Sequence, residues 1–337
     1  MRNPVQCNFH SILAPELYGF LDYREANGHT GSDERYVLRK LDKYLVDAGV
    51  SEKRLDAEIL DAWITSAPVG RNTKCHYISV SRKLAIYLCG LGIASFCPMS
   101  MHTKRNYTPY VLSHEEVQRL FDACDNLEAK SLTNVTLWLP VMARMLYGCG
   151  LRIGEAVSLQ NKDIDWEHNI LTIRSAKGNK DRLVPMSDSL SKICAAYYAI
   201  FHPSPVPEDY FFHNHKGQRF PTLRPYLWLR RVYDLAGIDR YPDPSQSRGV
   251  CVHTLRHTFA VHTLQNQSNA GIDRFYAVPI LSTYMGHNDI YGTELYLQLT
   301  PEYHESVVKR TESYVGNIFP VVHEGKLLLF LNISVPT

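Results

Sequence analysis

His253 and Arg256 lie three residues apart in an apolar run, residues 253–260, that is compatible with a helix. Residues at this spacing share one face of a helix, so both side chains can address the same small anion. A guanidinium offers a fork of donors that fits phosphate oxygens, and an imidazole transfers protons near neutral pH. The pair is suited to phosphoryl transfer, but the same spacing also occurs in helices as a surface ion pair or a core contact.

A second arginine, Arg152, follows a pair of glycines. The apolar run that begins at Val135 stops at Gly148 and Gly150. A new helix is predicted to begin near Arg152. The free N–H groups and the positive dipole end of that helix favour an anion, to which the guanidinium adds a bidentate grip. A helix corner in which Arg152 pairs with Glu155 explains the same residues equally well.

A third basic site is the turn Lys-Gly-Asn-Lys, residues 177–180, which two β-type runs flank. This pattern predicts a hairpin with basic residues at its tip. Lys177 lies just before the turn, from where a flexible ammonium can reach into a cleft. Without the other motifs, an ordinary solvated lysine explains it.

His287 and Tyr296 form the fourth pair and are nine residues apart. On one unbroken helix they would be separated by about 13 Å along the axis, so both reach one phosphate only if the chain turns between them. Asn288, Asp289 and Gly292 are residue types that favour such a turn.

In this order and at this spacing, the four motifs resemble the catalytic domain of the tyrosine recombinases, the phage integrase family. The resemblance covers residues 112–315 and rests on five elements: Gly-Leu-Arg-Ile-Gly-Glu, the Lys-Gly-Asn-Lys hairpin, His-Thr-Leu-Arg-His, Met-Gly-His and the tyrosine nine residues later. It implies six catalytic residues: Arg152, Lys177, His253, Arg256, His287 and Tyr296.

The resemblance also implies a role for each basic residue. Arg152 and Arg256 match the clamp on the scissile phosphate, and Glu155 matches the acidic residue that supports the first arginine. Two arginines can neutralise the charge that gathers on the non-bridging oxygens in the transition state. Lys177 matches the lysine that protonates the leaving 5′ oxygen.

Tyr296 matches the nucleophile of the family, and His253 and His287 match its first and second histidines. Attack by the tyrosine gives a 3′-phosphotyrosyl enzyme that conserves the energy of the broken bond, so rejoining needs no ATP. Tyr291 is a competing candidate for the nucleophile, but its spacing from His287 does not fit the family.

The sequence also bears on cofactors. It contains no Gly-x-x-x-x-Gly-Lys-Ser/Thr phosphate loop,. Cys251, His253 and His257 are close together, yet no Cys-x-x-Cys partner exists elsewhere in the sequence,. We therefore expect neither a metal nor another cofactor.

The net charge of +2 does not by itself indicate a nucleic-acid-binding protein, so the distribution of charge matters more,. Residues 62–114 contain no Asp or Glu. Six basic residues of this region are predicted to contact a DNA backbone: Arg71, Lys74, Arg82, Lys83, Lys104 and Arg105,. A basic surface that binds nothing is the alternative.

Eight cysteines at irregular spacings, in a sequence without a secretory hydrophobic segment, indicate reduced thiols and a cytoplasmic protein,. The longest apolar stretch, residues 326–336, is too short to span a bilayer,. Double-stranded DNA is the expected partner, and a membrane is not.

Residues 15–98 show helical periodicity with short breaks at residues 27–28, 49 and 68–70, which predicts a small all-helical domain,. The resemblance implies that this is a core-binding domain, which closes around a duplex together with the catalytic domain. Ser113 and Glu116 form a capping box that begins the first helix of the second domain. The predicted fold is mostly α-helical with a small β-sheet, an α+β catalytic domain. The predicted boundaries are 1–106 for the helical domain, 107–111 for a linker, 112–317 for the catalytic domain and 318–337 for a tail.

Two segments depart from the common form of the family. Residues 266–279 are longer than usual and predict either a longer loop or a rearranged helix, which bears on the position of His287. In the tail, the apolar residues 327–333 either dock on a neighbouring protomer as a strand-like peptide or cover their own domain,.

These features predict a site-specific DNA recombinase of a mobile element or phage. Because exchange of two duplexes needs four strand cleavages, we expect four protomers to assemble on DNA. A type IB topoisomerase shares the chemistry but acts alone, and the small helical domain and the tail favour recombination over it. A DNA-binding regulator that keeps the fold without the chemistry is a third possibility, against which the six competent catalytic positions argue.

Overall fold

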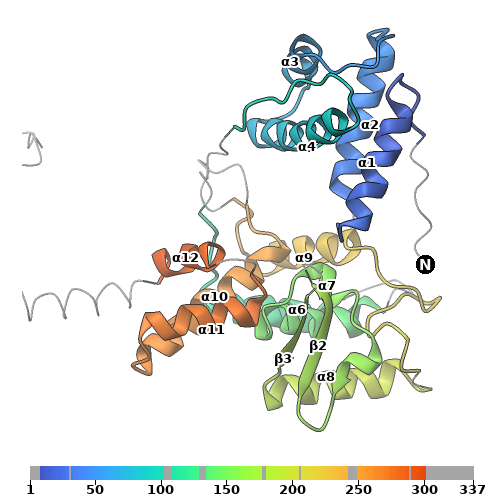
Figure 1. The fold of residues 1–337 in the computed structure, drawn as a ribbon. Helices are drawn as coiled ribbons and strands as arrows, with labels where there is room; N and C mark the ends of the chain where they lie inside the picture. The colour runs from blue at the N-terminus through green and yellow to red at the C-terminus, as the bar shows by residue number, and fades with distance from the viewer. Residues whose placement is uncertain are drawn as a thin grey trace, which may run out of the picture. The chain divides into compact units, whose positions relative to one another are not determined.

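The computed structural model describes residues 8–29, 32–101, 108–128, 134–176, 180–204, 206–241, 249–287 and 290–300. The chain divides into two compact units, Met1–Asn106 and Tyr107–Thr337 (Figure 1). Each unit has a hydrophobic core of its own. The fold is mostly helical with one three-stranded antiparallel sheet, which confirms the predicted fold class.

The first unit is a bundle of four helices: α1 (Ala14–Ala26), α2 (Ser32–Asp47), α3 (Ala57–Ser66) and α4 (Arg71–Gly90). Its helices form because apolar residues recur at helical spacing, as in α2, where Val37, Leu38, Leu41 and Leu45 are all buried,. The breaks predicted at residues 27–28, 49 and 68–70 lie between these helices.

In the second unit, the strands of the sheet lie between α7 and α8 in the order of the chain. Its elements are α5 (His114–Asp125), α6 (Val135–Gly148), α7 (Ile153–Ala156), a 3₁₀ turn (Asn161–Asp163), β1 (Ile164–Asp165), β2 (Ile170–Ala176), β3 (Lys180–Pro185), α8 (Asp188–Phe201), α9 (Leu223–Leu235), α10 (Val252–Asn269), α11 (Arg274–Met285) and α12 (Tyr291–Gln298). The predicted capping box begins α5: the Ser113 hydroxyl accepts from the Glu116 amide at 3.1 Å, and the Glu116 carboxylate accepts from the Ser113 amide at 2.9 Å.

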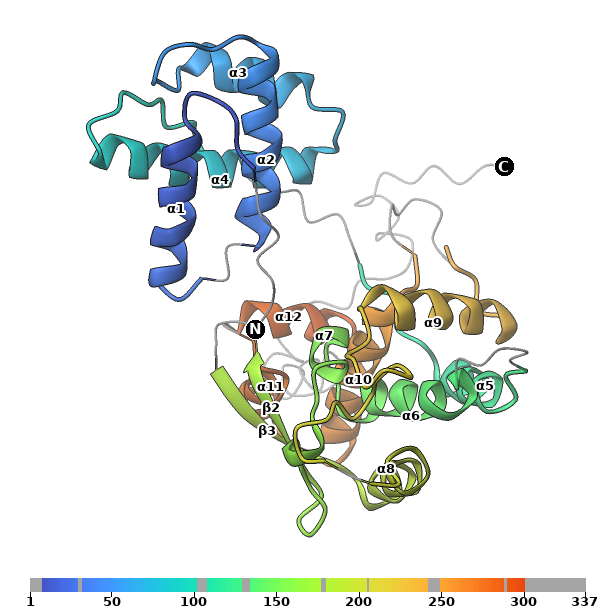
Figure 2. The same cartoon turned by 90° about the vertical axis from the view of Figure 1, so that its right-hand side faces the viewer.

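Helix α6 is the centre of this unit. It packs against α5, α8, α9 and α10, and in both views it lies between α8 and α9 (Figure 2). Its side chains Trp138, Leu139, Met142 and Met145 are fully buried, as a helix that is covered on several sides requires,. A second, smaller cluster holds α10, α11 and α12 together and includes Tyr296.

The predicted hairpin is confirmed as the antiparallel pair of β2 and β3. Leu171 pairs with Val184 and Ile173 pairs with Arg182, and the register shifts between Ile173 and Ala176. The tip of the hairpin, residues 177–179, lies outside the described residues, and Lys177 is among them.

The long segment at residues 266–279 is helical rather than a loop. Helix α10 continues to Asn269 and α11 begins at Arg274, so that only four residues join them. The Asp273 carboxylate caps α11 by accepting from the Phe275 amide at 2.9 Å,. Of the two alternatives for this segment, the longer loop is therefore wrong.

No helix in the described part of the chain is long and apolar enough to cross a membrane.

Candidate active site

A sharp turn between α6 and α7 sets the position of Arg152. Gly150 has φ +58°, and a Cβ atom there would lie 2.4 Å from the ring of Phe259, so the position requires glycine for both its backbone angle and the space,. Arg152 then occupies the N-cap of α7. Because α7 has only four residues, the helix dipole predicted to favour an anion here contributes little, and the guanidinium itself supplies the positive charge,.

Glu155 accepts hydrogen bonds from two arginines. Its Oε2 accepts from the Arg152 amide at 2.8 Å, and its Oε1 accepts from Arg152 Nη1 at 2.9 Å. Arg182 donates from Nη1 to Oε1 at 2.9 Å and from Nη2 to Oε2 at 2.8 Å. Burial alone would raise the pKa of Glu155, but the hydrogen bonds and charge of Arg182, together with Arg152, lower that pKa to about 2,. The carboxylate is thus ionised and holds both guanidinium groups.

Arg256 is the most deeply buried of the arginines described so far, with 1% of its surface exposed. It lies on α10 and donates from Nη1 to the Gly150 carbonyl at 2.5 Å and from Nη2 to the Met285 carbonyl at 2.7 Å. Burial, together with the positive charge of Arg152, lowers the pKa of Arg256 to about 10. That value still leaves the guanidinium protonated at neutral pH.

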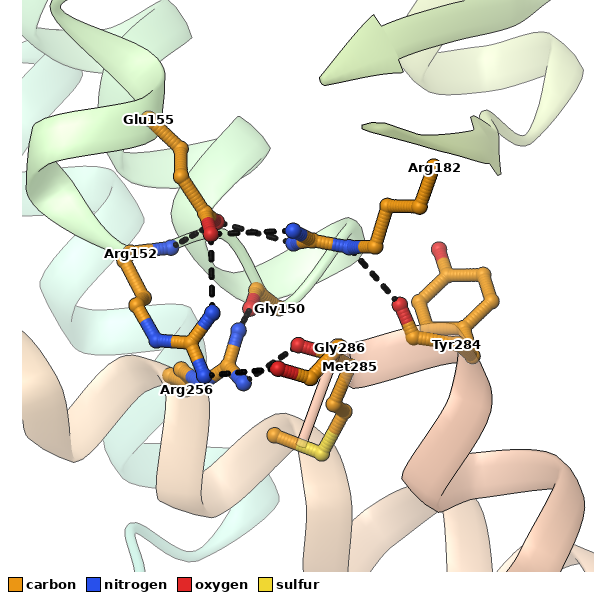
Figure 3. Close-up of polar contacts among 8 residues, drawn as sticks. All are labelled: Gly150, Arg152, Glu155, Arg182, Arg256, Tyr284, Met285 and Gly286. Atoms are coloured by element: carbon orange, nitrogen blue, oxygen red, sulfur yellow. Dashed lines mark hydrogen bonds and ion pairs between the residues drawn. The ribbon is translucent and has the colours of Figure 1, made fainter. Parts of the chain in front are cut away.

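The C-terminal end of α11 joins these arginines into one cluster. Its last two residues and its C-cap present carbonyl groups that have no partner within the helix,. Each of these carbonyls accepts from a different arginine (Figure 3). The pairs are Arg182 with Tyr284 at 3.0 Å, Arg256 with Met285 at 2.7 Å and Arg152 with Gly286 at 3.1 Å. The negative end of the α11 dipole thus faces three positive charges.

Tyr296 lies on α12 and is 3% exposed. Its hydroxyl is 3.0 Å from Nδ1 of His257. Burial raises the pKa of Tyr296, while the positive charges of Arg256 and Arg152 act in the opposite direction. The hydroxyl is therefore neutral near pH 7 and lies within the field of the arginine cluster.

The two predicted histidines, His253 and His287, lie next to His257 and Tyr296, respectively. The ring of His253 lies 4.6 Å from that of His257, and the ring of His287 lies 6.2 Å from that of Tyr296, centroid to centroid. His287 Nδ1 is also 2.7 Å from the hydroxyl of Thr293. Helix α11 ends at Met285 and α12 begins at Tyr291, so His287 and Tyr296 do not lie on one unbroken helix. Gly292 is part of α12, contrary to the expectation, and Asn288 and Asp289 lie outside the described residues.

Five of the six predicted catalytic residues are thus brought together, and Lys177 lies outside the described residues. Tyr291 is the first residue of α12. Its side chain lies outside the described part of the structure. The described residues contain no group of three or more His, Cys, Asp or Glu side chains arranged to hold a metal ion.

Two residues of this cluster, His257 and Arg182, were not among the predicted site residues. His257 is four residues after His253, so both lie on one face of α10, a spacing that could have drawn attention to it,. Arg182 alternates with Leu183, which is 62% exposed, and shares a face with the buried Val184. The period of two along a strand therefore places Arg182 on the inner face of the hairpin.

Four of the six predicted DNA-binding residues lie on α4. Lys74 donates to the Thr65 carbonyl at 3.0 Å, Arg82 donates to the Pro98 carbonyl, and Lys83 pairs with Glu34 at 3.1 Å. Arg71 is exposed at the start of the helix. Lys104 and Arg105 lie outside the described residues. Contact of these residues with DNA stays a prediction.

A helical body with a small antiparallel sheet, and with arginines, histidines and a tyrosine around one site, defines a catalytic domain of the integrase type. Residues 110–302, more than half of the chain, match the model of the phage integrase family. The chain therefore belongs to the phage integrase family, the tyrosine recombinases. Members of this family are enzymes that break and rejoin DNA strands.

Curated relatives and solved structures resemble the chain over much of its length. A putative integrase/recombinase of Sinorhizobium fredii is 33% identical over 214 residues, which are 60% of this chain and 66%, just under two thirds, of that protein. Tyrosine recombinase XerD of Listeria monocytogenes is 27% identical over 280 residues, 80% of this chain and 86% of that protein.

Two solved structures share the fold. The XerH recombinase, in a post-cleavage complex with its palindromic difH substrate, has a TM-score of 0.60 and 21% identity and covers 83% of this chain and 79% of its own. The integrase of transposon Tn1549, in complex with transposon right-end DNA, has a TM-score of 0.58 and 16% identity and covers 88% of this chain and 98% of its own.

Proposed function

We propose that the protein is a site-specific DNA recombinase in which Tyr296 attacks the scissile phosphate and forms a 3′-phosphotyrosyl intermediate, in the service of a mobile element or phage. One observation carries this proposal. The hydroxyl of Tyr296 is 3.0 Å from His257 and lies in a cluster that also contains the guanidinium groups of Arg152 and Arg256. A nucleophile, a proton acceptor and two phosphate ligands thus occur at one place.

Arg152 and Arg256 form the clamp on the phosphate. Among the described residues, the hydrogen bonds of each use two of the five N–H donors of a guanidinium,. The remaining donors serve the non-bridging oxygens of the phosphate, which gain charge in the transition state. Because protein acceptors already fix both groups, no reorganisation is needed when the substrate reacts.

Tyr296 requires a proton acceptor, because burial raises its pKa and keeps the hydroxyl protonated. His257 Nδ1 is within hydrogen-bonding distance and takes this proton as the bond from Oη to phosphorus forms,. The bond from phosphorus to the 5′ oxygen breaks, and Lys177 gives that oxygen a proton. A 5′ hydroxyl of another strand reverses these steps and rejoins the DNA, so that neither ATP nor a metal is required.

His253 and His287 complete the group of donors around the phosphate. They flank the nucleophile from two elements, α10 and the turn after α11. The helical unit binds the phosphate backbone of the DNA duplex through the basic residues of α4.

Suicide substrates test the proposal. The wild-type protein first selects a binding duplex from a random-sequence library, and versions of that duplex nicked at successive positions then trap the covalent intermediate. Formation of an adduct excludes a non-catalytic regulator, and strand exchange between two duplexes excludes a topoisomerase that acts alone. Cleavage should persist in EDTA. An absence of adduct on every nicked duplex contradicts the proposed chemistry.

Assembly on DNA as a tetramer is part of the proposal, with the apolar residues 327–333 as the segment that one protomer donates to the next. Free protein should be largely monomeric, because one short segment cannot offset the entropy of association until DNA aligns the protomers. Truncation after Ile318 should spare binding to a half-site but weaken cooperative filling of a full site, measured by gel-shift titration. Equal cooperativity in the truncated protein would show that the tail does not couple protomers.

A further inference from the structure

Arg182 is a third arginine in the cluster, and none of the motifs assigns it a role. We propose that Arg182 is a positioning residue that fixes β3, α7 and the end of α11 in one arrangement and thereby sets the positions of Arg152 and His287. This inference rests on the proposed function, because its consequence is a rate of DNA cleavage.

Every nitrogen of the Arg182 guanidinium donates to the protein. Nη1 and Nη2 form a bidentate pair with Glu155 at 2.9 and 2.8 Å, and Nε donates to the Tyr284 carbonyl at 3.0 Å. The side chain is 10% exposed. Arg152 and Arg256 keep more of their donors for a substrate, whereas Arg182 has one bond from each nitrogen to its own chain,. Arg182 therefore acts through other residues rather than on the phosphate.

The first of these residues is Glu155, which Arg182 and Arg152 share. In this arrangement both carboxylate oxygens accept from both arginines. Loss of Arg182 would leave Arg152 as the main partner of a buried negative charge. Glu155 would then neutralise Arg152 more completely and leave less positive charge for the phosphate.

The second is the end of α11, which immediately precedes His287. Arg182 holds the Tyr284 carbonyl, and its side chain packs on Gly286, where a Cβ atom would lie 3.1 Å from Cδ of Arg182. Gly286 has φ +65°, a left-handed backbone that favours glycine, and a Cβ atom there would also force the Arg182 side chain to shift,. The direction in which the chain leaves α11, and with it the position of His287, thus depends on Arg182.

Lysine cannot replace these contacts. An ammonium has a single nitrogen, so it cannot bridge both oxygens of Glu155 and also reach the Tyr284 carbonyl in a fixed plane. Arg182→Lys therefore keeps the charge of the cluster but removes the positioning. Arg182→Met removes both.

The matched control is Arg174, an arginine of the same hairpin. Its Nε donates to Asp163, outside the cluster, at 2.6 Å, and its side chain is 52% exposed. Arg174→Lys thus makes the same chemical change in the same sheet, next to another carboxylate.

The experiment measures single-turnover adduct formation and affinity on the selected duplex. Arg182→Lys should cleave on the order of 10²-fold more slowly, because small displacements of positioned groups carry losses of this size, with affinity within about threefold. Arg174→Lys should match the wild type. On a duplex with a methylphosphonate at the scissile position, the deficit of Arg182→Lys should shrink, because the uncharged phosphonate leaves less charge for Arg152 to neutralise.

Two results would overturn the inference: an Arg182→Lys protein as fast as the wild type, or a deficit equal on both substrates, which is what a general loss of structure predicts. If Arg182→Met does not fold, Arg182→Lys decides. If the wild type forms no adduct at all, the proposed function fails. The contact between Arg182 and Glu155 is tested separately by urea unfolding of Arg182→Lys, Glu155→Gln and the double variant. Additive changes in the free energy of unfolding would show that the two side chains do not interact.

Discussion

The basic side chains of α4 and those of the arginine cluster differ in burial. On α4, Lys83 is exposed and pairs with one carboxylate, that of Glu34, and Arg71 is exposed as well. In the second unit, Arg256 is 1% exposed and is fixed by two backbone carbonyls. Exposed charges attract a phosphate backbone over a distance and are screened by salt, whereas fixed buried donors act on single atoms. We therefore expect the first unit to act mainly on the affinity for DNA and the arginine cluster of the second unit to act mainly on the rate of cleavage.

The largest effect on the cleavage rate without a loss of DNA affinity is expected for substitution of the proposed nucleophile, Tyr296. Tyr296→Phe keeps the ring in the cluster of α10, α11 and α12 and removes only the hydroxyl. Covalent adduct should disappear completely while affinity for the selected duplex stays within about threefold of the wild type. Denaturing gels of suicide reactions measure the first quantity, and gel shifts measure the second.

Tyr291→Phe is the control, because Tyr291 is the competing tyrosine on the same helix. It should form adduct at the wild-type rate. Adduct from Tyr296→Phe, together with none from Tyr291→Phe, would reassign the nucleophile.

The clamp should show the next largest effect. Arg256→Lys and Arg152→Lys keep a positive charge but lose the planar fork, and one donor to a transition state contributes about 3 kcal/mol, on the order of 10²-fold in rate. Cleavage should fall by about that factor in each variant, with a much smaller change in affinity. Equal losses of affinity and cleavage would mean that these arginines only hold DNA, and the comparison of the two units would fail.

Acid should distinguish the carboxylate of Glu155 from that of Glu34. The pKa of Glu155 is lowered to about 2 from an ordinary value of 4.5, so its contribution to stability is complete above pH 4.5 and is lost as the pH falls toward 2,. The free energy of unfolding, from urea titrations at several pH values, should therefore decrease over this window, and Glu155→Gln should remove part of that decrease.

Glu34 in the first unit provides the comparison. Burial would raise its pKa, but the hydrogen bond and charge of Lys83, with Arg24, lower it, and the same sign applies. Glu34→Gln should flatten the pH dependence less than Glu155→Gln does, because the side chain of its partner Lys83 is 43% exposed and solvent screens that pair,. A larger effect from Glu34 would contradict the distinction.

The smallest effect is expected on α4. Arg71→Ala should weaken DNA binding at low salt and reduce the salt dependence of affinity by about one unit of slope, as loss of one phosphate contact does. The cleavage rate at saturating protein should not change. A slower rate at saturation would show that this region contributes to chemistry, and an unchanged salt dependence would favour a basic surface that binds nothing.

Much of the fold and the site could be predicted from the sequence. The glycines after α6, the hairpin, the capping box at Ser113 and the helix that carries His253 and Arg256 follow from local residue preferences, which act over a few positions,. The bond between His257 and Tyr296 could not be predicted in this way, because it joins residues 39 positions apart through the packing of α10 on α12.

The lengths of some helices could not be predicted from their residue types. The start of a helix near Arg152 was predicted, but nothing in the local pattern indicated that α7 would end after four residues. The segment at 266–279 contains residues compatible with either helix or loop. In the structure α10 ends at Asn269 with Ala270 as its C-cap, α11 follows the N-cap Asp273, and the two helices pack against each other.

The hydrogen-bond acceptors at the end of α11 are backbone carbonyls and not side chains. Carbonyl oxygens belong to every residue type, so substitutions at 284 and 285 leave the acceptors for Arg182 and Arg256 in place as long as the helix ends there. Position 286 is different, because any side chain would meet Arg182. Substitutions at 284 and 285 that preserve the packing of the buried Met285 position therefore leave the hydrogen bonds of the arginines in place, whereas a substitution at 286 disturbs them.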